Sequence, residues 1–306
     1  MSEEDFYDEY EDERMALHTL QSGALRVTIA DEGAELHSIL DILSEREYLW
    51  HGDPAYWGRR SPVLFPIVGS LKNKEYQYEG KAYPMSQHGF ARDMVFEMIA
   101  HDEDSIQFAL TANDETLSKY PFRFRLEVGY RLNGREITVT WKVVNEDSKT
   151  MYFSIGGHPA FMCPVDGNGK QTDYYLLFDK KEDLTYSKLS TNGLIESEGH
   201  ILPTNGGVLP IAEHLFDEDA LVIEGRQAKE VALAGPDRKP YLTVKFDAPL
   251  FGLWSPAKKQ APFVCIEPWY GRCDKESFDG TLAEREYGNT LQPGDTFEAA
   301  YTITCN

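Results

Sequence analysis

The stretch FRFRLEVGYRLNGREITVTWKVVNED, residues 122–147, shows the clearest structural pattern in the chain. Apolar side chains occupy alternate positions on both sides of a turn signal: Phe122, Phe124, Leu126 and Val128 before it, and Ile137, Val139 and Trp141 after it. A period of two is typical of a strand with one buried face, and the dipeptide Asn133-Gly134 favours a two-residue hairpin turn. The stretch therefore predicts a long antiparallel β-hairpin.

The same pattern recurs in shorter segments from Leu17 onward. Residues 94–112 predict a second hairpin with its turn in the acidic HDEDS, and further strands are predicted over 241–247, 263–269 and 297–305. The best helix candidates, IAEHLF (211–216) and GTLAEREYG (280–288), are short. Strands at intervals of about 8–12 residues with few short helices predict an all-β protein, built as a large antiparallel β-sandwich.

The length of 306 residues permits one domain or two. The chain has no internal repeat, linker or composition break after its first residues, so we predict a single β-sandwich domain over residues 17–306. Residues 1–16 form an acidic leader with eight acids among the first 14 residues, which predicts a solvated, mobile segment. Its aromatic residues Phe6, Tyr7 and Tyr10 leave open the alternative that this segment docks on the body of the protein or on a neighbouring chain. The oligomeric state stays open.

Net charge and cysteine content indicate which partners the protein binds and in which cell compartment it is expected. The formal net charge of −21 opposes binding to nucleic acid or an anionic membrane. The first residues have neither a basic start nor an apolar run, and no later stretch has the length of a membrane span. The four cysteines form no C-x-x-C pair, so free thiols are expected. We therefore expect a cytoplasmic protein.

Four stretches combine titratable residues with glycine or proline beside apolar segments: WGRRSPVLFPIVG (57–69) with Arg59 and Arg60, SQHGFARD (86–93) with His88 and Arg92, GGHPAF (156–161) with His158, and CIEPWYGRCD (265–274) with Glu267. Glycine and proline set special backbone geometry at the ends of strands. We therefore expect these titratable side chains to line one cleft.

Each candidate also has a structural explanation. A histidine beside glycine is often a hydrogen-bonded structural group, and a carboxylate after an apolar strand, such as Glu267, is costly to bury unless it is paired or functional. A salt bridge to Arg272 would pair the Glu267 carboxylate and give its burial a structural explanation. Two histidines and a glutamate, His88, His158 and Glu267, resemble a set of metal ligands. His158 follows His88 by 70 residues and precedes Glu267 by 109, so the set contains no local ligand pair. No metal is predicted.

Taken in order, Arg, FP-x-x-G, HGFAR, GGHPAF and IEPW resemble the aldose 1-epimerases (mutarotases), most closely the bacterial LacX-type branch. The resemblance runs from about Leu17 to Cys305. It implies a sandwich related to the galactose-mutarotase superfamily and an isomerase that interconverts the α and β anomers of an aldohexose. It implies no metal or organic cofactor, because the chemistry is proton transfer.

The resemblance also assigns roles to three residues. His158 would be the general acid that protonates the ring oxygen, and Glu267 the general base that takes the proton of the anomeric hydroxyl, with the two on opposite sides of one sugar. A histidine titrates near neutral pH, and a partly desolvated glutamate gains basicity. His88 would hydrogen-bond the ring oxygen or a neighbouring hydroxyl.

Further residues are expected to bind the sugar. Arg60, or else Arg59, would hold hydroxyls, and their spacing does not decide between them. Asp219 matches the family's acidic sugar ligand loosely, with Asp217 and Glu218 as rivals. Two aromatic residues beside the charged candidates, Trp57 and Trp269, are candidates for stacking on the apolar face of a sugar.

The substrate is the most open question. HGFAR with its Arg92 is shared with the hexose-6-phosphate epimerase branch, so Arg92 either binds a phosphate or braces its turn through Asp93. Three hypotheses follow: a 1-epimerase of free aldohexoses, a hexose-6-phosphate 1-epimerase, or a non-catalytic carbohydrate-binding protein of the same fold. The acidic net charge favours the free sugar.

Overall fold

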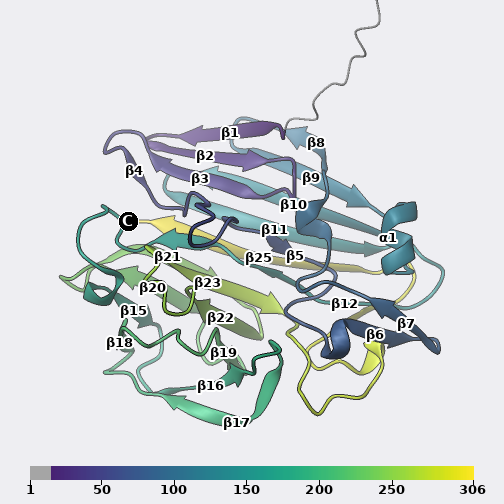
Figure 1. The fold of residues 1–306 in the computed structure, drawn as a ribbon. Coiled ribbons are helices and arrows are strands. Elements are labelled where there is room, and N and C mark those ends of the chain that lie inside the picture. The colour runs from purple at the N-terminus through teal and green to yellow at the C-terminus, as the bar shows by residue number, and fades with distance from the viewer. Residues whose placement is uncertain (1–14) are drawn as a thin grey trace, which may run out of the picture.

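The computed structural model describes residues 15–306, so the predicted acidic leader lies outside it except for its last two residues. The described chain is strand-rich, and every pairing between its named strands is antiparallel (Figure 1). The prediction of an all-β antiparallel sandwich is confirmed. The prediction of a single domain over residues 17–306 stays a prediction.

The largest sheet has nine strands and contains both predicted hairpins. In spatial order its strands are β18 (Val208–Pro210), β15 (Tyr175–Phe178), β20 (Glu230–Ala234), β21 (Pro240–Phe246), β25 (Thr296–Cys305), β11 (Glu136–Asn145), β10 (Phe124–Asn133), β9 (Ser105–Thr111) and β8 (Glu97–His101). Along β11 buried residues alternate with more exposed ones throughout, as the period of two predicts. The turn is displaced by one residue: Asn133 pairs with Glu136, and Gly134, with φ of 58°, is the first turn residue.

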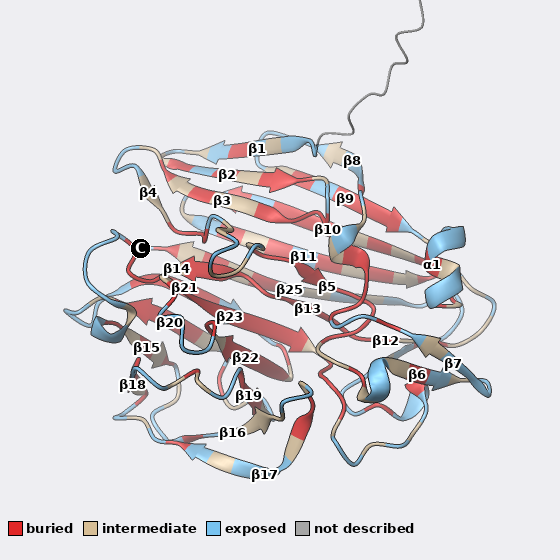
Figure 2. Cartoon of the chain, in the orientation of Figure 1, coloured by how far each residue is buried: buried red, intermediate tan, exposed pale blue. Residues whose placement is uncertain are grey.

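The second large sheet positions the functional site. Its order is β17 (Ile195–Leu202), β16 (Leu184–Leu189), β19 (Leu221–Glu224), β22 (Leu250–Trp254), β23 (Phe263–Tyr270), β13 (Ile155–Gly157) and β5 (Val63–Leu64), with β14 (Ala160–Met162) also paired to β23. All residues of β23 except the last are buried, in contrast to the alternating β11 (Figure 2). Both faces of this strand are therefore covered.

Smaller sheets complete the fold. Four strands form one sheet: β1 (Leu17–Ser22), β2 (Leu25–Ala30), β3 (Leu36–Asp41) and β4 (Arg46–Glu47). Two pairs stand apart: β6 (Glu75–Tyr78) with β7 (Lys81–Pro84), and β12 (Met151–Phe153) with β24 (Asn289–Leu291). One hydrophobic cluster joins the three largest sheets, for example through Val27, Val139 and Ile266. Burial of this shared apolar surface holds the layers together.

Helices are few and short, as predicted, but not where the sequence suggested. The one α-helix of the described residues is α1 (Asp114–Lys119), capped by the side chain of Asn113. Residues 213–218 form turns instead of the candidate helix at 211–216, and the other candidate contains only one 3₁₀ turn. The 3₁₀ turns are η1 (Lys72–Lys74), η2 (Ala91–Asp93), η3 (Gln171–Asp173) and η4 (Leu282–Glu284). Within residues 15–306, no helix combines the length and apolar character that a membrane crossing needs.

Candidate active site

A cavity of about 250 Å³ lies against the second large sheet and brings together residues from distant parts of the chain. Seven of the nine predicted site residues line it: Trp57, His88, Arg92, His158, Asp219, Glu267 and Trp269. Arg59 and Arg60 do not. The cavity is therefore the structure's candidate for the cleft that the four sequence stretches predicted.

Strand alternation places Glu267 in this cavity. On β23, Val264 and Ile266 point into the main hydrophobic core, so Cys265 and Glu267 lie on the opposite face. The Glu267 side chain is 1% exposed, and neither of its carboxylate oxygens has a hydrogen-bond partner. The salt bridge to Arg272 that would explain it structurally is not formed, because Arg272 pairs with Glu224 and Glu286 instead. A structural pairing therefore does not account for this buried carboxylate.

His158 occupies the turn between β13 and β14. Its backbone N–H donates to the carbonyl of Pro62, and its ring lies against that of Trp57, with the ring centroids 4.7 Å apart. The turn thus fixes the backbone and the indole fixes the ring. Its Nε2 lies 3.2 Å from Oε2 of Glu267. The predicted acid and base therefore lie side by side, rather than on opposite sides of a sugar.

Burial controls the protonation of this pair. Desolvation, together with the nearby Arg92 and Arg59 cations, lowers the pKa of His158 to about 3. Desolvation raises the pKa of Glu267 well above its usual value, and the Asp219 carboxylate adds to the rise. Each residue resists carrying a charge alone. Desolvation favours the neutral form of both residues, so the one titratable proton of the pair lies on Glu267 and His158 is uncharged.

His88 is held by the FP-x-x-G stretch. The Gly69 N–H donates to Nδ1 of His88 at 3.0 Å, and the His88 N–H donates to the Gly69 carbonyl at 2.9 Å. Because Nδ1 accepts a hydrogen bond, a neutral His88 carries its proton on Nε2. Desolvation, followed by the neighbouring His158 and two arginines, lowers the pKa of His88 well below its usual value. His88 is thus a neutral donor at the cavity.

Arg92 belongs both to its turn and to the cavity. Its Nη2 donates to the carbonyl of Gln87 at 2.9 Å, which closes the turn that holds His88. Its Nε is 3.8 Å from Asp93 and has no hydrogen-bond partner. Desolvation and the Arg59 cation lower the pKa of Arg92 to about 10, so it stays charged at neutral pH. Arg92 therefore braces its turn through a hydrogen bond to a backbone carbonyl, and its ion pair with Asp93, the bracing contact considered from the sequence, is a longer contact.

Arg59 and Arg60 line a neighbouring depression, which shares Trp57 and Arg92 with the cavity. Arg59 donates to Asp93 at 2.6 Å. The Arg60 guanidinium donates to the carbonyl of His37 at 3.0 Å. Neither arginine lines the cavity of the acid and base pair, although the Arg59 cation is near enough to lower the pKa of His158.

Asp219 is the acidic residue of its stretch that reaches the cavity. Its two rivals are engaged elsewhere: Asp217 contacts His214 at 2.8 Å, and Glu218 pairs with Lys188. The backbone of Asp219 has a positive φ of 72°, and its carboxylate accepts from the Ala220 N–H at 2.8 Å. This turn directs an acceptor to the cavity rim.

Three indoles line the cavity, on Trp57, Trp254 and Trp269. Trp254 was not predicted; its ring meets the His158 ring edge to face, with the centroids 5.4 Å apart. Trp254 pairs with Cys265 between β22 and β23, and this pairing places it beside the site. The register of these two strands was therefore the sequence signal that could have identified Trp254. Indole faces suit the apolar face of a sugar ring.

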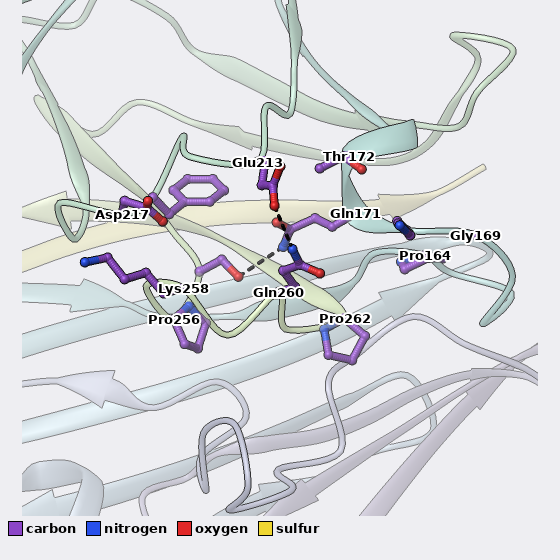
Figure 3. Close-up of a pocket in the computed structure, with 13 residues that line it drawn as sticks. Pro164, Gly169, Gln171, Thr172, Glu213, Asp217, Pro256, Lys258, Gln260 and Pro262 are labelled. Atoms are coloured by element: carbon purple, nitrogen blue, oxygen red, sulfur yellow. Dashed lines mark hydrogen bonds between the residues drawn. The ribbon is translucent and has the colours of Figure 1, made fainter.

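A second, polar pocket of about 210 Å³ is lined by Asp217, the rival candidate to Asp219, and by no other residue that the sequence singled out for the site (Figure 3). The amide nitrogen of Gln171 donates to Ser255 Oγ at 3.0 Å and to two backbone carbonyls, and Gln260 donates to Glu213 at 3.1 Å. These bonds tie the loops at 169–173 and 255–262 together. The polar groups of this pocket are thus used for loop closure.

Comparison with known proteins identifies the family of the chain. The aldose 1-epimerase family pattern matches residues 16–304. Two LacX proteins of Lactococcus lactis subsp. lactis, plasmid and chromosomal, are each 34% identical over 294 residues, which cover 93% of this chain and 98% of theirs.

Two solved structures are similar throughout. A galactose mutarotase related enzyme from Lactobacillus acidophilus has a TM-score of 0.90 and 37% identity, covering 95% of this chain and 97% of that one. A galactose mutarotase-like protein from Lactobacillus casei has a TM-score of 0.88 and 31% identity, covering 95% of this chain and all of that one. On these grounds the chain belongs to the aldose 1-epimerase family.

Proposed function

We propose that the protein interconverts the α and β anomers of a free aldohexose, with His158 as the general acid and Glu267 as the general base. Family membership supports a sugar epimerase, and the specific reaction and substrate are our proposal. One observation carries it: two buried titratable side chains lie 3.2 Å apart at a cavity, and the carboxylate has no hydrogen-bond partner within the described chain. A buried carboxylate without a partner is costly unless it has a function.

The side-by-side arrangement suits this reaction. Ring opening removes the proton from O1 of the sugar and delivers one to O5, and both oxygens are bonded to the same carbon. The two protein groups that serve them must therefore be close together. The reaction starts once the proton of the pair has moved from Glu267 to His158; the Nε2 proton then passes to O5 as the bond from C1 to O5 breaks, and Glu267 takes the O1 proton. Rotation about the bond to C1 and reversal of both transfers closes the ring on its other face.

The other cavity residues support binding. His88 presents an Nε2–H donor toward the oxygens of a bound sugar, and Asp219 presents an acceptor for hydroxyls. The indoles of Trp57, Trp254 and Trp269 exclude water from the proton transfers.

Charge distribution favours an uncharged substrate over a hexose phosphate. Arg92 is the one arginine of residues 15–306 that lines the cavity, and one of its nitrogens is already used by Gln87. Arg59 is neutralised by Asp93, and Arg60 bonds a backbone carbonyl. A dianionic phosphate would thus meet a single cation.

Polarimetry of freshly dissolved α-D-glucose and α-D-galactose tests the proposal. Glu267→Gln keeps the shape of the side chain without its basicity, and His158→Asn removes the titrating ring. Each should lower the rate by about 10²–10⁴-fold, the scale of a positioned acid or base. Exposed residues offer matched controls, Glu136→Gln and His101→Asn, which should keep the wild-type rate.

Two results would overturn the assignment. Near-normal mutarotation by Glu267→Gln would remove Glu267 as the base. A wild-type rate no faster than spontaneous mutarotation, together with measurable sugar binding, would favour the non-catalytic carbohydrate-binding alternative.

A further inference from the structure

The His158–Glu267 pair has a third neighbour that carries a soft ligand atom. Cys265 precedes Glu267 by two positions on β23, so alternation places both side chains on one face of the strand. One ligand atom each from His158, Cys265 and Glu267 lie within 4.8 Å of one another, and all three residues are buried. Nitrogen, sulfur and oxygen ligands therefore converge at the candidate acid and base.

We propose that these three side chains form an inhibitory binding site for a thiophilic divalent cation, of which Zn²⁺ and Cd²⁺ are the probes. Imidazole, thiolate and carboxylate are the protein ligands that zinc prefers, and three of them with one open position form an exchangeable site. The open position faces the cavity, because His158 and Glu267 line it. Only the inhibitory effect rests on the proposed function.

The distances need little adjustment. Two ligand atoms on a tetrahedral zinc ion lie roughly 3.3–3.7 Å apart, given bonds of about 2.0–2.3 Å. The His158 Nε2 and Glu267 Oε2 atoms are already 3.2 Å apart. No two of the three ligand atoms are more than 4.8 Å apart, so tetrahedral geometry takes a shift of at most roughly an ångström. Neither oxygen of Glu267 has to give up a hydrogen bond.

Binding would block proton transfer. The Cys265 thiol and the His158–Glu267 pair each release one proton to solvent, so that Cys265 binds as a thiolate, Glu267 as a carboxylate and His158 as a neutral imidazole. The ion then occupies the lone pairs on Nε2 and the carboxylate that proton transfer requires. Because the proposed reaction needs no metal, protein treated with a chelator should keep its full activity, and added zinc should reduce it.

The test uses the full-length protein after chelator treatment and removal of the chelator. Titration with Cd²⁺ is followed by the ultraviolet charge-transfer absorption of a cadmium thiolate, and Zn²⁺ retention by equilibrium dialysis. Wild type should bind about one ion at this site, with parallel loss of mutarotation that EDTA reverses. Cys265→Ser should keep the basal rate, lose the absorption and need at least about tenfold more zinc for half-inhibition.

Cys273 provides the matched control, since it is the other thiol near the pair and lines the cavity. Cys273→Ser should keep the cadmium absorption. An absorption that survives in Cys265→Ser, or no retained zinc in wild type, overturns the proposal. Circular dichroism checks the fold, and Cys265→Ala serves if the serine variant does not fold. Since dialysis needs no sugar, zinc binding without mutarotation would refute only the proposed function, and mutarotation without zinc binding only this site.

Discussion

The most informative single residue outside the acid and base pair is Arg92, because it serves two structural roles at once. It lines the cavity and also donates to the Gln87 carbonyl within the turn that holds His88. A residue that only recognised phosphate would be dispensable for a free sugar. A residue that braces the turn positions His88 for every substrate, and we expect the second behaviour.

Arg92→Ala should therefore slow the epimerisation of glucose and of glucose 6-phosphate by similar factors and lower the melting temperature. Arg59→Ala removes a half-exposed ion pair with Asp93 and leaves the contact between Arg92 and Gln87, so it should change little. Polarimetry with both sugars and a thermal melt of each variant provide the measurements. A loss of about 1.5–3 kcal/mol that appears only with the phosphate would instead identify Arg92 as a phosphate ligand.

At the scale of elements, two loops that are distant in the sequence hold each other. The Phe65 carbonyl accepts from the N–H groups of Phe90 and Ala91 at 3.0 and 3.1 Å, and Gly69 bonds both the backbone and the ring of His88. Gly89 makes this approach possible. Its φ is 73°, and a Cβ atom there would lie 2.2 Å from the Phe65 oxygen. The FP-x-x-G and HGFAR stretches are thus one structural unit.

Gly89→Ala should disrupt this unit, and Gly80→Ala is its matched control. Gly80 has nearly the same φ, 75°, but a Cβ atom there would meet nothing within 4 Å. Gly80→Ala should cost only the left-handed backbone energy of about 1–2 kcal/mol. Gly89→Ala should cost about 1–3 kcal/mol more, because the backbone must also move apart. Urea denaturation measures both, and equal losses would contradict the docking of the two loops.

The same elements show what the sequence could predict. The alternation of apolar residues predicted the β10–β11 hairpin, because one face of each strand is buried. The observed turn lies one residue beyond the predicted one. Helix α1 was missed: it has only six residues, and its signal is the Asn113 cap followed by two acids in its first turn. Local capping decides so short a helix, and periodicity cannot detect it.

For the site, the position of a side chain could be predicted where strand alternation determines its direction. Glu267 follows from alternation along β23. Arg60 does not, because its orientation depends on another sheet: Glu35 accepts from the N–H groups of Arg60 and Ser61 at 2.8 and 2.7 Å, and the guanidinium donates to His37. Contacts between residues 23 to 26 positions apart leave no local pattern in the sequence.

At the scale of the whole molecule, charge is the dominant property. The formal net charge is −21, from 51 acidic and 30 basic residues. Such a charge produces a long-range negative potential that repels anions and has no effect on a neutral sugar. Salt screens this potential, with a Debye length of about 30 Å at 0.01 M and about 8 Å at 0.15 M. Ionic strength therefore separates the two substrate classes without any mutation.

We expect kcat/KM for glucose to stay constant between 0.01 and 0.15 M salt, roughly the range over which screening becomes complete at the cavity mouth. For glucose 6-phosphate, kcat/KM should rise with salt, because screening weakens repulsion of the dianion by the acidic surface. We also expect glucose to be used at least as efficiently as its phosphate, since Arg92 is the one arginine of the described residues at the cavity. Side-by-side anomer measurements at both salt concentrations check this. A phosphate preference that weakens as salt is added would show that local cations outweigh the net charge, and would make the hexose-6-phosphate reaction the correct assignment.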